Sequence, residues 1–342
     1  TMPFQIALAN DTYEAGSRLK GTLNITSDVP IAAKALRLFF KGEERTRCID
    51  PDSKQSAEAA CPLHEMVEEM SNMVIKGGKI KAGTYKLPFD LAIPQELPQT
   101  VSIPHTRITY VVGYELEDRK GRIVEKDETK VNILAEQIAH RPRPYHREPF
   151  LEFVKKNRFK KGHFVITTHI QDTILEPGEV VGVSVAVRNR SPLKIKKVKV
   201  MLKQQVHATA VNNEREAERI LTFHEFKEYR KMKRKRKKWL RGTDELEDFD
   251  DVQEALESEE HDGELRVPKN ATLTYDGQLF DVKHDLYILI QTDQKDDIEI
   301  RIIPIELIRK EPKKEEEIKE NDDDQESDDE SAAAEQPSNV LA

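Results

Sequence analysis

The sequence is poor in cysteine, with only Cys48 and Cys61 among its 342 residues, and it holds a single tryptophan. Two cysteines cannot make a disulfide framework or, on their own, a four-ligand zinc site. No apolar run approaches the ~18 residues that span a bilayer. The first residues also lack the basic start and apolar stretch of a signal peptide. We therefore expect a cytoplasmic protein without a transmembrane segment, either free, peripheral on an endosomal or plasma membrane, or nuclear.

Catalytic signatures are missing as well. The segments that begin at His64 and His224 open like the zinc-protease helix motif, but neither has the second histidine four residues after the first. There is no phosphate-binding loop and no G-x-S-x-G nucleophile motif. His140, His146 and His163 fall near one another in the sequence at a spacing that fits no standard metal frame. We expect no enzyme activity, no cofactor and no metal site.

Charge is abundant but unevenly distributed. Charged residues make up 35% of the chain, and the formal net charge is −8. Residues 311–342 hold 13 acidic and 3 basic residues, which leaves 52 basic and 50 acidic residues in the rest of the chain. The negative charge is therefore a property of this tail. Its composition cannot bury enough apolar surface to order itself, so we expect an acidic disordered tail over 311–342.

Most of the chain shows the two-residue period of β-strands. Phe4, Ile6 and Leu8 alternate with polar residues, and strand patterns continue to about residue 140. An Ala-, Glu- and Met-rich run at 56–72 breaks the pattern and predicts a short helix or excursion. A proline-rich stretch at 141–162 predicts an extended linker. Strand patterns then return over 163–310.

An internal repeat at a constant offset of 162 residues joins the two strand-rich parts. It spans about 40 residues without a gap, and each copy contains three strands separated by a glycine-containing turn and a proline-marked turn. The matched pairs include Phe4 and Ile166, Gly16 and Gly178, Leu23 and Val185, Pro30 and Pro192, Leu36 and Val198, and Lys41 and Lys203. A duplicated β unit of ~150 residues predicts an all-β protein with two tandem β-sandwiches, at 1–140 and 163–310.

One segment interrupts the second copy. Residues 213–264 hold many helix formers. The first part of this segment, residues 213–241, contains neither glycine nor proline, and Ile220, Phe223 and Phe226 occur there at three-residue spacing. This pattern predicts a charged helical insert in the second sandwich. Residues 227–241 contain ten basic residues and one acidic residue, whereas residues 243–264 contain twelve acidic residues and no basic one.

Several segments resemble the arrestin family. The spaced glycines and apolar residues of 12–44 resemble the opening of the arrestin N-terminal domain, and 82–117 resembles its later G-x-Y-x-L-P-F strand region. Residues 175–205, 267–290 and 302–308 resemble strands of the arrestin C-terminal domain. The likeness is nearest to the alpha-arrestins, although their PPxY motif is absent and the first strand lacks the lysine pair of the receptor arrestins.

The resemblance implies two arrestin-type sandwiches in a non-enzymatic scaffold or adaptor for membrane-protein trafficking or signalling. The expected partners are cytoplasmic segments of membrane proteins and trafficking machinery, with anionic lipid headgroups as a further candidate. Retromer-type endosomal coat subunits share this fold, so a coat role is a related alternative. The rival in another class is a nuclear or chromatin-associated scaffold that uses the basic insert, although nucleic acid is not an expected partner because no aromatic residues interleave the bases.

The basic run supplies the candidate site residues. It fits a nuclear-localisation segment, an anionic-lipid contact with Trp239 at the membrane interface, or a helical hairpin neutralised by the adjacent acidic segment. The candidates are Arg230, Lys231, Lys233, Arg234, Lys235, Arg236, Lys237, Lys238, Trp239 and Arg241. In the tail, Ser327 precedes Asp328, Asp329 and Glu330 and fits an acidic-directed phosphorylation site.

Overall fold

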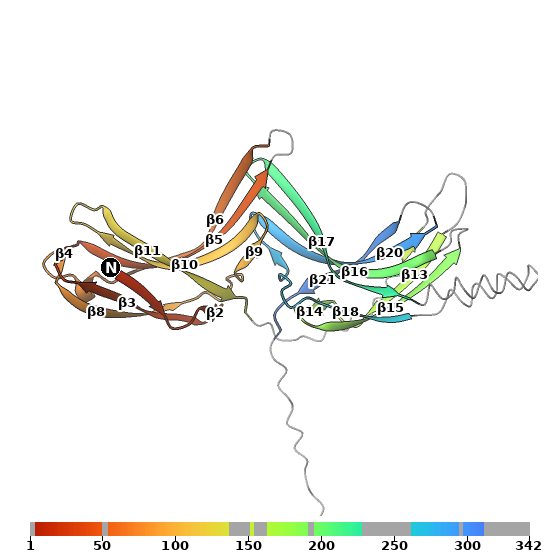
Figure 1. The fold of residues 1–342 in the computed structure, drawn as a ribbon, viewed down its shortest axis with the longest axis horizontal. Coiled ribbons are helices and arrows are strands. Elements are labelled where there is room, and N and C mark those ends of the chain that lie inside the picture. The colour runs from red at the N-terminus through yellow and green to blue at the C-terminus, as the bar shows by residue number, and fades with distance from the viewer. Residues whose placement is uncertain are drawn as a thin grey trace, which may run out of the picture. The chain divides into compact units, whose positions relative to one another are not determined.

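The computed structural model describes residues 4–49, 54–136, 151–153, 163–190, 195–227, 261–293 and 297–310. In these ranges nearly all residues that have regular structure lie in β-strands, and the one helix is the four-residue α1 (Ser71–Val74). No helix in these ranges has the length and apolar character needed to cross a membrane. Figure 1 draws the first half of the chain from red to yellow and the second half from green to blue.

The first half forms a β-sandwich from two sheets of unequal size. The smaller sheet has the order β1 (Phe4–Leu8), β3 (Arg18–Ser27) and β8 (Gly83–Ala92). The larger sheet has the order β2 (Thr12–Glu14), β11 (Ile123–Leu134), β10 (Thr106–Glu117), β5 (Ala35–Ile49) and β6 (Ser56–Glu69), and β9 (Val101–Ile103) pairs with β10. The short strands β4 (Ile31–Ala32) and β7 (Lys79–Ile80) pair with each other. Phe4 of the small sheet stacks on Tyr114 of the large one, with ring centroids 5.1 Å apart.

The second half repeats this arrangement. Its smaller sheet has the order β12 (Leu151–Phe153), β13 (His163–Ile170), β15 (Val180–Arg190) and β18 (His261–Arg266). Its larger sheet has the order β14 (Ile174–Leu175), β21 (Ile298–Leu307), β20 (Phe280–Thr292), β16 (Ile195–Ala210) and β17 (Asn213–Phe226), and β19 (Tyr275–Asp276) pairs with β20. The expectation of an all-β protein with two tandem β-sandwiches is confirmed.

The strand registers carry the same offset of 162 as the sequence repeat. Phe4 pairs with Ile25 across β1 and β3, and Ile166 pairs with Val187 across β13 and β15. The turn glycines Gly16 and Gly178 both have positive φ values, +80° and +97°, which a side chain would strain. The repeat therefore marks equivalent buried and turn positions in the two sandwiches.

The sequence predicts a short helix or excursion at 56–72 and a helical insert over 213–264, whereas the structure has an edge strand at the start of each of these segments. Residues 56–69 form β6, which pairs with β5, and residues 213–226 form β17, which pairs with β16. Phe223 is 54% exposed whereas Phe226 is buried, so the two do not share the one apolar face that a helix would give them. Residues 261–264 of the expected helical insert also lie in a strand, β18, and its residues 228–260 lie outside the described ranges. Alanine and glutamate favour helices locally, but pairing with a long neighbouring strand outweighs that weak preference.

Candidate functional site at the contact between the two sandwiches

The site residues predicted from sequence lie outside the described part of the chain. This applies to the basic positions from Arg230 to Arg241, to the expected acidic tail and to Ser327. Of the three histidines that lie near one another in the sequence, His140 and His146 are outside the described ranges, and His163 is the first residue of β13. Within the described ranges no group of three or more His, Cys, Asp or Glu side chains could hold a metal ion.

The structure instead draws attention to β5, the long strand that leads from the first sandwich to the second. Its even-numbered residues point into the protein, beginning with Leu36, Leu38 and Phe40. Because a strand alternates strictly, the same face later carries Glu44, Thr46 and Cys48. Glu44 is fully buried, with 0% of its surface exposed. A buried carboxylate is costly unless it accepts several hydrogen bonds.

Glu44 obtains these bonds from the backbone of the second sandwich. Its Oε1 accepts hydrogen bonds from the N–H groups of Leu279 and Phe280, at 3.0 and 2.9 Å. Its Oε2 accepts a third from the N–H group of Gln278, at 3.1 Å. Hydrogen bonds to a charged acceptor are about twice as strong as neutral ones. One carboxylate of the first sandwich thus satisfies three successive donors at the turn between β19 and β20.

The turn is built for a close approach. A Cβ atom at Gly277 would lie only 2.6 Å from Oε1 of Glu44, so a side chain there would push the carboxylate away. Tyr275 lies on the preceding strand. Burial, and then the negative charge of Glu44, raise the pKa of the Tyr275 hydroxyl above its ordinary value. Both residues therefore form part of the pocket that receives Glu44.

The rest of the contact continues along β5 and β16. The hydroxyl of Thr46 donates to the carbonyl oxygen of Thr209, and the thiol of Cys48 donates to that of Ala208, at 3.5 Å. Ala208, Ala210, Phe280 and Val282 come from the second half of the sequence but belong to the buried apolar cluster of the first sandwich. We call this set of contacts, with Glu44 and residues 277–280, the seam. It joins the two sandwiches, because these apolar residues of the second half extend the core of the first, while the second sandwich keeps a separate core of its own.

The seam also brings together two hairpins that end in long edge strands. β5 contacts β16 and β17, and β6 contacts β16. In the described ranges β6 pairs with β5 alone and β17 pairs with β16 alone, so each has one edge of backbone groups without a strand partner. Both strands are 14 residues long. Such edges can accept an additional strand from a partner.

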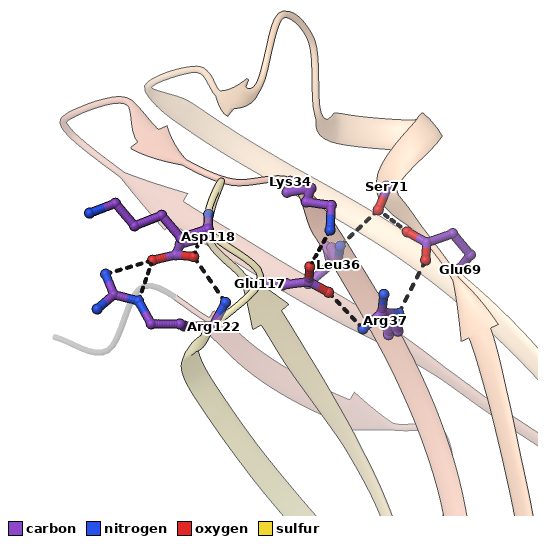
Figure 2. A network of polar contacts seen from close by, with 9 residues as sticks. Lys34, Leu36, Arg37, Glu69, Ser71, Glu117, Asp118 and Arg122 are labelled. Carbon is purple, nitrogen blue, oxygen red and sulfur yellow. Dashed lines mark hydrogen bonds and ion pairs between the residues drawn. The ribbon is translucent and has the colours of Figure 1, made fainter.

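A second polar arrangement lies at the opposite end of β5 (Figure 2). The carboxylate of Glu117 pairs with Lys34 at 2.7 Å and with Arg37 at 2.9 Å, and Arg37 also reaches Glu69 at 3.4 Å. The hydrogen bond from Lys34, followed by the other effects of the two cations, lowers the pKa of Glu117 despite the opposing effect of burial. This network fixes the ends of β5, β6 and β10.

Sequence reasoning missed Glu44, although a signal was present. The alternation of Leu36, Leu38 and Phe40 continues in register to Glu44, which places a carboxylate on the buried face. A buried charge in a strand calls for donors, but the sequence does not show which backbone groups provide them. Gln278, Leu279 and Phe280 lie more than 230 residues away in the chain.

Comparison with known proteins agrees with this architecture. The family model described as Arrestin (or S-antigen), N-terminal domain, matches residues 3–138. The model described as Arrestin (or S-antigen), C-terminal domain, matches residues 160–311. No curated protein matches the chain. The two family models together cover both sandwiches and the seam between them, and the chain therefore belongs to the arrestin-like family.

Proposed function

We propose that this protein is a non-enzymatic arrestin-like adaptor that binds cytoplasmic segments of membrane proteins for trafficking or signalling. The observation that carries the proposal is the pair of 14-residue edge strands, β6 and β17, on hairpins that meet at the seam. An extended peptide can add to such an edge through main-chain hydrogen bonds, with alternate side chains supplying selectivity.

The two edges are protected against indiscriminate pairing. Cross-strand ion pairs line both hairpins, including Lys41 with Glu65 and Lys199 with Glu225. β6 also carries Pro62 beside the register shift at Gly42 and Glu43. A partner strand must therefore match a charged, irregular edge. This favours a specific peptide partner over self-association.

The seam supports the same proposal. Glu44 and the shared apolar cluster hold the two hairpins in one compact unit, so a partner that meets both edges does not have to order them first. Pre-organisation of this kind raises affinity because less conformational freedom is lost on binding. The protein thus offers two pre-organised edge strands to flexible segments of other proteins.

Proximity labelling in the source cell tests this function. The full chain fused to a biotin ligase should label membrane proteins on their cytoplasmic segments, in excess over the ligase alone. Synthetic peptides of the labelled segments should then slow amide hydrogen exchange in β6 or β17. Protection confined to other strands would contradict the edge-binding mode.

The same experiment separates the adaptor from the nuclear alternative. A set dominated by nuclear proteins, together with nuclear accumulation that is lost when residues 228–260 are deleted, would overturn the proposal in favour of a scaffold using Lys233–Lys238. This deletion leaves β17 and β18 intact, because they end at Phe226 and begin at His261. Labelling of coat proteins alone would identify an endosomal coat subunit instead of a cargo adaptor.

A further inference from the structure

The end of the first sandwich remote from the seam carries a concentration of positive charge. Residues 76–81 and 119–122 together hold six cations and no acidic residue. The cations are Lys76, Lys79, Lys81, Arg119, Lys120 and Arg122, and all six are exposed. β5 runs from this end to the seam, and the eleven steps from Ala35 to Thr46 correspond to roughly 36 Å at ~3.3 Å per residue.

The two loops are held against each other. The guanidinium of Arg119 donates through Nε to the carbonyl oxygen of Gly78, at 3.3 Å, and the N–H group of Ala33 donates to the same oxygen, at 3.2 Å. Gly77 and Gly78 have φ values of +64° and +73°, which turn the chain sharply before β7. A Cβ at Gly78 would lie 3.2 Å from Arg119. The cations of both loops therefore share one surface.

The neighbouring carboxylates already have partners. Glu117 binds Lys34 and Arg37, and Asp118 binds Arg122 through a contact of 3.0 Å (Figure 2). Lys76, Lys79, Lys81 and Lys120 form no ion pair with any residue of the described ranges. These four ammonium groups are available to an anionic partner.

Apolar side chains flank these loops. Met73 lies in α1, just after β6, and is 57% exposed, and Ile123 and Val124 at the start of β11 are 54% and 51% exposed. Cations next to exposed aliphatic side chains match the chemistry of a bilayer surface, where phosphates lie above acyl chains. A nucleic acid would favour aromatic side chains between the bases. None occurs in residues 73–81 or 118–124.

We propose that this basic end, defined by residues 73–81 and 118–124, docks onto an anionic phospholipid bilayer. The lysines and arginines contact headgroup phosphates, while Met73, Ile123 and Val124 enter the headgroup boundary. In the sequence of the second half, the segment that connects β20 and β21 contains Asp293, Asp296 and Asp297 and one lysine. At this one connection the sequence is basic in the first half and acidic in the second. The inference is independent of the peptide-binding edges and of residues 230–241.

Vesicle co-sedimentation of the purified full chain tests the proposal. The probes are vesicles of phosphatidylcholine with 30% phosphatidylserine and vesicles of phosphatidylcholine alone. Each lysine near the surface contributes about fivefold to partitioning, so Lys76→Ala/Lys79→Ala/Lys120→Ala should weaken binding to the anionic vesicles by about a hundredfold. The matched control Lys20→Ala/Lys86→Ala/Lys130→Ala removes the same charge from exposed strand positions elsewhere on this sandwich and should have a much smaller effect.

The basic run at Lys233–Lys238 requires a second background. The same two triple variants are therefore compared in a chain in which residues 233–238 are replaced by glutamine, where the preference for the Lys76/Lys79/Lys120 set should persist. Equal losses for the two triple variants, or unchanged binding, would overturn the proposal. The proposal would also be overturned if the Lys76/Lys79/Lys120 variant lost binding to a DNA duplex but bound the anionic vesicles as well as the wild type does. Because the vesicles contain no protein partner, the outcome of this test is independent of whether the proposed adaptor function is correct.

Discussion

The two sandwiches share their backbone arrangement and differ most in the side chains that fill their cores. Their equivalent strands have the same order, apart from β12 in the second sandwich and the β4–β7 pair in the first, and the turn glycines Gly16 and Gly178 both have positive φ. Their cores use different side chains. The first stacks Phe4 on Tyr114 and Phe40 on Tyr110, whereas the second packs mostly branched aliphatic residues around Phe164 and Phe226. Equal backbones thus tolerate different packing, as long as the buried face keeps its two-residue period.

The comparison extends to the edge strands. β17 ends at Phe226, opposite Val198, and the chain after β6 reaches Met70, whose N–H group donates to the carbonyl oxygen of Leu36 at 2.8 Å. Leu36 and Val198 are equivalent at the offset of 162. Met70, directly after β6, and Phe226, the last residue of β17, each place one buried side chain in the core of their own sandwich, and this contact anchors a strand that is otherwise partly exposed.

Loss of these anchors should have the largest effect. Phe226→Ala should lower the free energy of unfolding by about 3 to 5 kcal/mol, and Met70→Ala by about 2 to 5 kcal/mol, because each leaves a cavity. Phe223→Ala is the control and should change it little, since that side chain is exposed. Urea unfolding followed by circular dichroism provides the measurement. Equal losses at Phe223 and Phe226 would restore the helical interpretation of residues 213–226.

The seam breaks the equivalence of the halves, because Val206 stands where the repeat offset would place the counterpart of Glu44. Glu44→Ala removes the acceptor of three N–H groups and should cost about 3 kcal/mol or more. Glu44→Gln keeps one carbonyl oxygen and should cost less. Glu43→Ala, a partly exposed neighbour paired with Arg45, is the control and should cost under ~1 kcal/mol. If the Glu44 and Glu43 variants unfold at the same urea concentration, the carboxylate does not hold the seam.

Lys41 and Lys203 are equivalent in the repeat but differ in surroundings. Lys41 forms one half-exposed pair with Glu65 at 3.0 Å, whereas the Lys203 side chain is only 6% exposed and binds Glu218 and Glu299. Lys203→Met should destabilise the protein by about 2 kcal/mol because it leaves two carboxylates without their cation. Lys41→Met should cost less than ~1 kcal/mol. A thermal melt of both variants measures the difference, and similar shifts would show that burial adds nothing at Lys203.

The fold was largely predictable because the two-residue period of apolar side chains and the 162-residue repeat can both be seen directly in the sequence. Leu23 and Val185, or Leu36 and Val198, occupy matched positions that strand alternation alone makes buried. The edge strands were not predictable in the same way. Ala57, Ala59 and Leu63 of β6 pack on the core at alternate positions, but the alanines and the four glutamates of this strand produce a helix-like composition. Only the pairing with β5, a tertiary contact, decides for the strand.

The site was less accessible than the fold. Segments with strong composition, such as Lys233–Lys238, attract notice in a sequence, whereas a single glutamate in β5 does not. The importance of Glu44 comes from a turn in the other sandwich whose N–H groups converge on it. The basic end shows the same limit: residues 76–81 and 119–122 are each short, and only the contact of Arg119 with Gly78 unites them.

The smallest expected effect concerns Glu117, whose pKa in the folded protein is below its usual value of 4.5 because Lys34 and then Arg37 favour the charged form. A lowered folded pKa means that the stabilisation is complete above the unfolded value and is lost as the pH falls through the folded one. The wild-type protein should therefore be more stable than Glu117→Gln at pH 7, and the gap should close below about pH 4.5. Urea unfolding at pH 7, 5 and 4 gives the measurement. A gap that stays constant with pH would show that Glu117 stabilises the protein through packing instead of charge. The second sandwich has the uncharged Thr292 near the equivalent strand end, so it would then be the better model for how this end of the first sandwich is stabilised.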